Sequence, residues 1–312
     1  MKKLISVVLI ISLILCLFTS CKKDSTDITD EKTSGELSDI LEKYKTNGLS
    51  LWWEAVAVYN AGENPAEYKG FKELYLSLEG KTNLDMAKYV IVANIAIIKG
   101  ANPKDFAKYE EYKSNLKNLL ENVTGDYPLN DYIFGYYALR SSVVYFDSKS
   151  IISYFYEAQK SDGGFALSSS TESSDVDITA FAIPALKLAH DNLLANYDIE
   201  HYPPAIAVRF LESQINENGT FSSYGIENSN STACALSALI MYYKDDANET
   251  VKKAADGLKL FTAKKGVGYS YLMDGDVNAL ATAQAAIALG DLENKTSVWE
   301  KLYNETQKIN IN

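Results

Sequence analysis

The sequence predicts an all-α fold in which one helical unit is used several times. Apolar residues recur at the i, i+3, i+4 and i+7 spacing of helices through most of the chain, and strand signals are weak. The pattern T-A-x-A-x-x-A-L occurs three times at intervals of about 50 residues, opening at Thr179, Thr232 and Thr282. Each copy follows a glycine turn that carries an aromatic residue. One supersecondary unit therefore repeats along the chain.

The chain opens with the features of a secretory signal sequence over residues 1–20. Lys2 and Lys3 supply positive charge, and an almost unbroken apolar run ends in small residues before Cys21. The Phe-Thr-Ser-Cys ending resembles a bacterial lipobox, which predicts lipidation of Cys21; an ordinary secretory signal with an incidental cysteine is the alternative. We therefore expect an extracytoplasmic protein, lipid-anchored to the bacterial cell membrane, with residues 21–36 as a flexible tether.

Residues 37–312 are predicted to form one domain in which two kinds of helix alternate. Helices that carry small and apolar residues on nearly every face are expected at 51–61, 86–98, 131–142, 178–190, 231–243 and 280–290. Amphipathic helices with one charged face are expected at 36–46, 67–79, 104–122, 148–160, 203–215 and 248–263, followed by a final helix at 296–308. A helix that is apolar all round must be surrounded by protein. The alternation therefore predicts two concentric layers.

Two architectures satisfy this alternation. The closed form is an α/α toroid of about six helical hairpins, and the open form is a right-handed helical solenoid. Six hairpins are enough to close a ring, so we expect the toroid.

Composition excludes several classes of partner and site. The formal net charge is −11, and removal of the two signal lysines would leave 28 basic residues against 41 acidic ones, or −13. That balance argues against nucleic acid, which needs a basic face, and against peripheral binding to anionic lipid. Cys234 lies at a small-residue position of an apolar helix, and only His190 and His201 could add imidazole ligands. We expect no metal site.

Several segments together resemble the α/α-toroid superfamily of squalene–hopene cyclases, protein prenyltransferase β-subunits and the helical domain of cobalamin carriers. The closest resemblance is to the prenyltransferase/squalene-oxidase-repeat domains of Gram-positive surface proteins. The segments that carry it are Trp52-Trp53, residues 85–91, residues 159–165, residues 175–180 and residues 276–282. The resemblance implies the toroid fold, but not a particular chemistry, because this superfold hosts unrelated functions.

The departures from these families concern their catalytic residues. Squalene–hopene cyclases carry Asp-x-Asp-Asp-Thr-Ala, in which the middle aspartate protonates an alkene. Asp175 and Asp177 match the first two acids, and Ile178 replaces the third. The prenyltransferase zinc ligands and the Cys-x-Glu-Gln thioester string have no counterpart. A cobalamin carrier adds a small β-rich domain, so a corrinoid here would need a partner or a second subunit to close its site.

In a toroid the N-terminal ends of the inner helices meet at one rim, where helix dipoles and unpaired N–H groups converge. The polar residues expected there are Asn130, Asp131, Asp175, Asp177, Asn228, Asn230 and Asn278. Asp177 and Asn230 precede helix-opening threonines, which favours N-caps. Asp175 and Asn228 lie two residues earlier, and this makes them better ligand candidates. Acidic side chains at this rim favour a cation, a hydroxyl or an amide group.

Aromatic side chains on the inner helices could line the centre of the ring. Trp53, Tyr132 and Phe181 are the residues expected to face it. The glycine turns that carry Phe165, Phe221 and Tyr269 are interpreted as structural staples between repeats.

The leading functional prediction is a binding protein with no required cofactor. Its ligand would be a bulky small molecule, such as a corrinoid or an isoprenoid, or the peptide or glycan of a surface-protein partner. One alternative is a terpene-cyclase-like enzyme with Asp177 as general acid and Asp175 orienting it. The other is a non-catalytic interaction scaffold. A deep aromatic funnel would favour small molecules, and a centre filled by side chains would favour the scaffold.

Overall fold

The structure is a computed structural model that describes residues 34–142, 144–193 and 202–311. The predicted signal sequence, Cys21 and most of the tether lie outside the described residues. Thirteen α-helices occur in the described ranges: α2 (Leu37–Asn47), α3 (Trp52–Asn60), α4 (Phe71–Ser77), α5 (Asn83–Ile98), α6 (Tyr109–Glu121), α7 (Leu129–Arg140), α8 (Lys149–Ala158), α9 (Val176–Leu193), α10 (Pro203–Gln214), α11 (Ser229–Tyr243), α12 (Glu249–Lys259), α13 (Ala279–Asn294) and α14 (Val298–Ile311). The predicted all-α class is confirmed.

Two of the expected outer helices are shorter than the sequence pattern suggested. The segment 67–79 is divided into a 3₁₀ turn, η1 (Pro65–Glu67), and α4, because Gly70 between them has a φ of 78°. A side chain at Gly70 would place its Cβ 2.5 Å from the carbonyl oxygen of Leu49. The segment 104–122 likewise opens with a 3₁₀ turn, η2 (Pro103–Asp105), before α6.

A short hairpin interrupts the helices and was not predicted. Its strands, β1 (Ser222–Ser223) and β2 (Ile226–Glu227), pair antiparallel between α10 and α11. The two turn residues, Tyr224 and Gly225, have φ values of 51° and 77°, which is the geometry of a tight two-residue hairpin turn.

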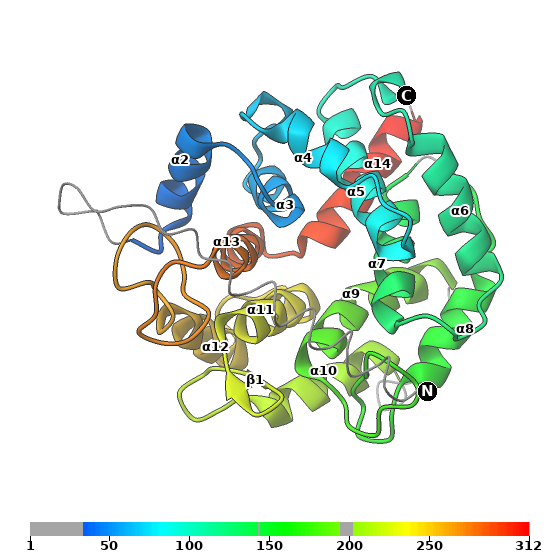
Figure 1. Cartoon of the computed structure of the whole chain (residues 1–312). Coiled ribbons are helices and arrows are strands. Elements are labelled where there is room, and N and C mark those ends of the chain that lie inside the picture. The colour runs from blue at the N-terminus through cyan, green and yellow to red at the C-terminus, as the bar shows by residue number, and fades with distance from the viewer. Residues whose placement is uncertain (1–33, 143, 194–201, 312) are drawn as a thin grey trace, which may run out of the picture. The chain divides into compact units, whose positions relative to one another are not determined.

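The apolar helices contact one another in a closed circuit. In order, α3 packs on α5, α5 on α7, α7 on α9, α9 on α11, α11 on α13, and α13 back on α3 (Figure 1). The amphipathic helices lie against this circuit: α4 contacts α3 and α5, α6 contacts α5 and α7, α10 contacts α9 and α11, and α12 contacts α11. Each inner helix therefore contacts the next inner helix along the chain, and the last contacts the first.

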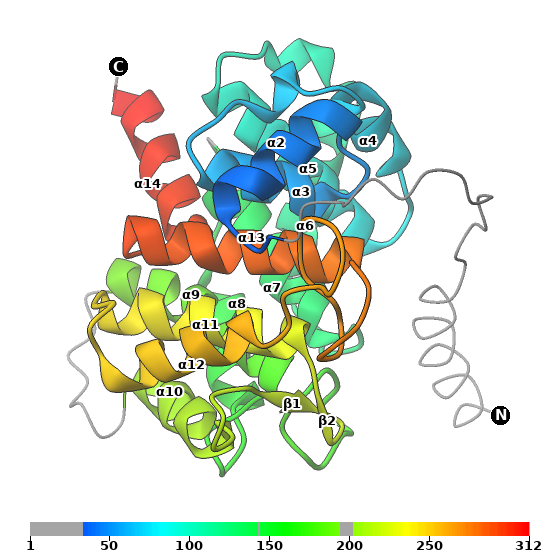
Figure 2. The same ribbon diagram turned by 90° about the vertical axis from the view of Figure 1, so that its left-hand side faces the viewer.

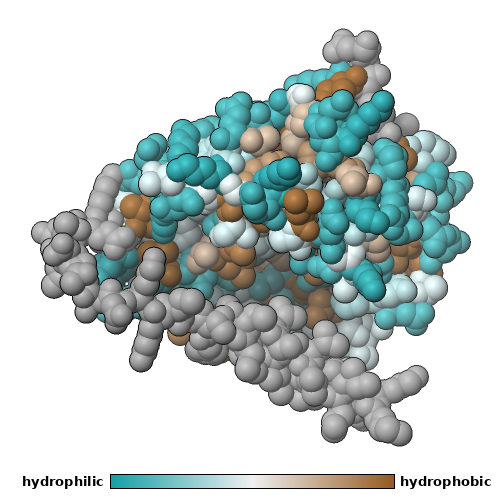
Figure 3. Space-filling view, turned by 45° about the horizontal axis from the view of Figure 1, so that its top comes forward, coloured by the Kyte–Doolittle hydropathy of each residue, from teal (hydrophilic) through white to brown (hydrophobic). Residues whose placement is uncertain are grey.

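The two helix sets differ in burial as their compositions predict. In α5, for example, Val90, Ile91 and Ala93 are completely buried. In α12 only one stripe is buried, through Val251, Ala254 and Leu258. The surface facing the viewer in Figure 3 is mostly hydrophilic with scattered apolar patches, as expected where charged helix faces meet solvent.

The last helix closes one end of the circuit. α14 contacts α3, α5, α7, α9 and α13. Its Trp299 is 6% exposed and stacks on Tyr137 with ring centroids 4.5 Å apart. In Figure 2, α14 lies at one end of α13, and the loop that precedes α13 lies at the other. No helix within the described ranges is long and apolar enough to span a membrane.

Candidate functional site

The repeated threonines join each glycine turn to the helix that follows it. The hydroxyl oxygens of Thr179, Thr232 and Thr282 accept hydrogen bonds of 2.9–3.0 Å from the backbone N–H groups of the turn aromatics, Phe165, Phe221 and Tyr269. All three aromatic side chains are buried. The repeated threonine therefore makes the same hydrogen bond in each unit. This agrees with the interpretation of these turns as structural staples.

Hydrogen bonds also connect the N-terminal ends of four inner helices to one another. Leu129 at the start of α7 donates its N–H to the carbonyl of Leu167 in the loop before α9. Ser223 donates to Asp175 before α9, and Ser229 at the start of α11 donates its N–H to Tyr271 before α13. These bonds hold the starts of α7, α9 and α11 against the loops that precede α9, α11 and α13.

The predicted N-caps of α9 and α11 are two residues out of position. Asp175 Oδ1 accepts from the N–H of Ile178, and Asn228 Oδ1 accepts from the N–H of Ser231, so these residues are the caps, not Asp177 and Asn230. The reason is that the turn aromatic pairs through its carbonyl with the N–H of the residue at each cap, which fixes where the helix begins. Asn278 caps α13 in the same way, on the N–H of Ala281.

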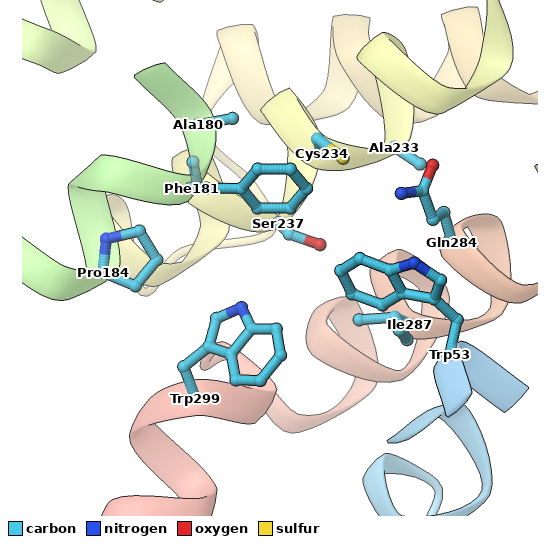
Figure 4. Close-up of a pocket in the computed structure, with 11 residues that line it drawn as sticks. Trp53, Ala180, Phe181, Pro184, Ala233, Cys234, Ser237, Gln284, Ile287 and Trp299 are labelled. Atoms are coloured by element: carbon cyan, nitrogen blue, oxygen red, sulfur yellow. The ribbon is translucent and has the colours of Figure 1, made fainter. Parts of the chain in front are cut away.

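The repeat also determines which side chains face the axis of the circuit. Counting from each threonine, the variable residues at +2 are Phe181, Cys234 and Gln284, and those at +5 are Pro184, Ser237 and Ile287. All six line one small cavity, together with Trp53, Trp299 and three alanines (Figure 4). The residue at −2 lies one turn nearer the rim on the same face. That residue is Asp177 in α9, Asn230 in α11 and Leu280 in α13.

The inner helix α7 lacks the threonine motif, but one of its faces also lies toward the axis. Phe134 contacts the rings of Trp53, Phe181 and Trp299, so it faces the axis. Asn130 lies four residues before Phe134 and so one turn nearer the rim. The axial face therefore has a polar layer of Asn130, Asp177 and Asn230 above an aromatic layer.

Two oxygens of the polar layer are out of contact with solvent and have no hydrogen-bond partner. They are Asn130 Oδ1 and Asp177 Oδ1, on the neighbouring helices α7 and α9. Burial and the nearby Asp175 carboxylate raise the pKa of Asp177 well above its ordinary value, and a hydrogen bond with Ser231 opposes that rise. Buried polar atoms in proteins are normally paired, so each of these oxygens is suited to a donor from outside the protein.

Below this layer the centre is almost filled. The cavity among Trp53, Phe181 and Trp299 measures about 20 Å³, which is room for one water molecule. Gln284 Oε1, which borders it, is also buried without a partner. The expected deep funnel is absent from the part of the axis that the structure describes, because α14 inserts Trp299 from the far end.

The predicted central aromatics have different positions. Trp53 and Phe181 line the central cavity, with ring centroids 5.9 Å apart. The prediction for Tyr132 is wrong: its ring packs on Tyr154 of α8, and its hydroxyl accepts from the N–H of Gly125. It lies two residues before Phe134, about 200° round the helix from the axial face, and so it faces the outer layer.

The remaining predicted residues lie away from the axis. Asp131 is buried between α7 and α5, where desolvation raises its pKa to about 6 against an opposing hydrogen bond from Asn83. Asp175 borders a separate cavity of about 310 Å³ between the loop before α9 and the β1–β2 hairpin, lined also by Gln214 and Tyr224. Cys234 is buried, and burial raises the pKa of its thiol above its ordinary value. This is the behaviour of a packed side chain and not of a reactive thiolate.

Sequence reasoning missed Gln284 and Trp299 as axial residues, whereas Asn130 was expected at the rim. The first could have been found, because it occupies the same variable position of the repeat as Phe181. Across the described ranges no group of three or more His, Cys, Asp or Glu side chains is placed to hold a metal ion. His201 lies outside the described residues.

No protein-family model matches the chain, and no curated protein matches it. The function must therefore be argued from the site itself.

Proposed function

We propose that this chain is a lipid-anchored extracytoplasmic binding protein, related to the prenyltransferase/squalene-cyclase-like toroids, whose ligand is held at the inner-helix rim. The supporting features are the closed circuit of inner helices, the hydrogen-bonded rim and the signal-like N-terminus. The observation that carries the proposal is the pair of buried, unpartnered oxygens on Asn130 and Asp177 above an aromatic layer.

The cavity size restricts what such a ligand can be. A space of about 20 Å³ cannot admit a corrinoid ring or an isoprenoid chain. The ligand instead places one small hydrogen-bond-donating group in the polar layer, while the rest of it lies over the rim. We call this polar layer and its aromatic base the axial mouth, formed by Asn130, Asp177, Phe134, Phe181 and Trp53.

The test is native mass spectrometry of residues 32–312, which form a compact unit of their own. The protein is incubated with a pool of small molecules extracted from bacterial lysate. A stoichiometric adduct is expected with the unaltered protein and with Asp256→Asn, an exposed control on α12. The adduct is expected to disappear when Asn130→Leu and Asp177→Leu are combined. An adduct that survives this pair of substitutions would contradict the proposed site.

The cyclase alternative is less compatible with the site. A carboxylic acid that protonates an alkene must be strong, whereas burial and Asp175 make Asp177 a weaker acid than a free aspartic acid. The space beneath it is also too small for a polyprenyl substrate. Incubation with squalene or geranylgeranyl substrates is expected to yield no cyclised product.

One observation favours the scaffold alternative as a second candidate. Large apolar side chains are exposed on two neighbouring rim loops: Tyr224 is 82% exposed, Ile226 50%, Leu272 48% and Met273 41%. Exposed apolar side chains grouped in this way mark protein-interaction surfaces. If the scaffold is correct, Tyr224→Ser with Leu272→Ser will abolish co-purification of a surface protein after cross-linking, and the axial-mouth substitutions will not.

A further inference from the structure

We infer that the group accepted by the axial mouth is an N–H-bearing organic ammonium, such as the end of an alkylamine chain. This inference rests on the proposed function and names the chemical class of its ligand.

The first property is hydrogen bonding. Asn130 Oδ1 and Asp177 Oδ1 are both acceptors without a donor. A primary ammonium carries three donors and no acceptor, so one such group can donate to both unpaired oxygens. A quaternary ammonium has no N–H and would leave both oxygens unpaired. An alcohol could pair with one of them through its single O–H.

The second property is charge. The side chains that act on Asp177 are the hydroxyl of Ser231, the carboxylate of Asp175, the thiol of Cys234 and the phenols of Tyr224 and Tyr271, none of which carries positive charge. The carboxylate therefore has no cationic partner among these neighbours. The whole chain has a net charge of −11, and this field attracts cations to the surface.

The third property is the aromatic base. Phe134 and Phe181 lie one turn below the two oxygens, and their ring centroids are 5.2 Å apart. Trp53 is 5.9 Å from Phe181 and 5.8 Å from Phe134 by the same measure. Aromatic faces attract an ammonium group through their negative quadrupole, and they give no comparable attraction to a neutral hydroxyl.

The fourth property is size. The cavity beneath the rings measures about 20 Å³ and is lined by neither Asn130 nor Asp177, so the space below the polar layer holds nothing larger than a water molecule. A terminal NH₃⁺ therefore stays at the polar layer, and its alkyl chain extends toward the rim. A trimethylammonium group is several times larger. Hydrogen bonding and size therefore select the same class, which is a primary ammonium on an extended chain.

The experiment is calorimetric titration of residues 32–312 with three probes of equal chain length: n-butylammonium, n-butanol and butyltrimethylammonium. We expect n-butylammonium to bind at least about tenfold more tightly than either of the others. Asp177→Asn is expected to weaken its binding about tenfold or more, and Phe181→Leu about two- to fivefold. Asp256→Asn is the matched control and should leave binding unchanged. Circular dichroism melts establish that each variant is folded.

The possible results distinguish failure of the ammonium inference from failure of the proposed function. If n-butanol binds as tightly as n-butylammonium, or if Asp177→Asn binds the amine unchanged, the ammonium inference is wrong, whereas rim binding stands. If the trimethyl compound binds best, the preference for a cation stands, but the requirement for N–H donors is wrong. If neither the probes nor the lysate pool bind, both the inference and the proposed function fail.

Discussion

Replacement of Trp299 by alanine tests whether α14 closes the axis. The indole is 6% exposed, stacks on Tyr137 and lies 6.2 Å from the ring of Trp53. A buried tryptophan removes about 200 Å² from water, which at about 25 cal/mol per Å² is worth about 5 kcal/mol. Alanine retains a small part of that area, and the neighbouring rings will relax partly into the space. We therefore expect Trp299→Ala to lower the free energy of unfolding by about 3–5 kcal/mol.

The assay is urea unfolding of residues 32–312, followed by circular dichroism of the helices. Leu272→Ala, on an exposed rim loop, is the control and should change stability by less than about 0.5 kcal/mol. Indole added to the Trp299→Ala protein should recover part of the loss, because an apolar cavity of this kind accepts a matching small molecule. A loss below about 1 kcal/mol would refute the reasoning, since it would mean that Trp299 does not pack into the centre.

Three further predictions concern the repeats, a close backbone approach and pH. Thr232→Val removes the acceptor for the buried N–H of Phe221 and should cost about 1–3 kcal/mol in urea unfolding, whereas the exposed Thr124→Val should cost little. Gly219→Ala should destabilise by about 2 kcal/mol or more, because φ is 88° and the new Cβ would lie 2.0 Å from the carbonyl oxygen of Lys253; a Tm equal to that of the unaltered protein would contradict this. Burial raises the pKa of Asp291 to about 8, so the folded protein holds a proton that the unfolded chain releases near pH 4. Its contribution to stability is therefore present at acid pH and is lost as pH rises toward about 8, and Asp291→Asn should flatten that decline when stability is measured across the range.

Much of the helical framework could be predicted from residue patterns because its causes are local. The apolar periodicity places α5, α9 and α13 within a few residues of their observed bounds. The aligned threonines at Thr179, Thr232 and Thr282 indicate one repeated unit. The same alignment shows which positions of each helix face the axis. The variable positions that hold Phe181 and Gln284 line the cavity because positions +2 and +5 share one helix face.

The exact helix starts depend on contacts that the local pattern does not contain. Asp175 and Asp177 are both acceptable N-caps by residue type. The choice between them follows from the backbone pairing of Phe165 with Asp175 across the glycine turn. The same pairing leaves Asp177 inside the first turn of α9, where its Oδ1 has no partner.

The sequence by itself determined the all-α class, the alternation of apolar and amphipathic helices and the rim as the place where polar residues gather. These follow from periodicity and side-chain polarity, which are properties of short segments. Only the tertiary structure decided that α14 fills the axis with Trp299, that Tyr132 faces outward and that Asn130 joins Asp177 above the aromatic rings. Those outcomes depend on which helices lie side by side, and residues far apart in the chain meet only after the circuit of helices has closed.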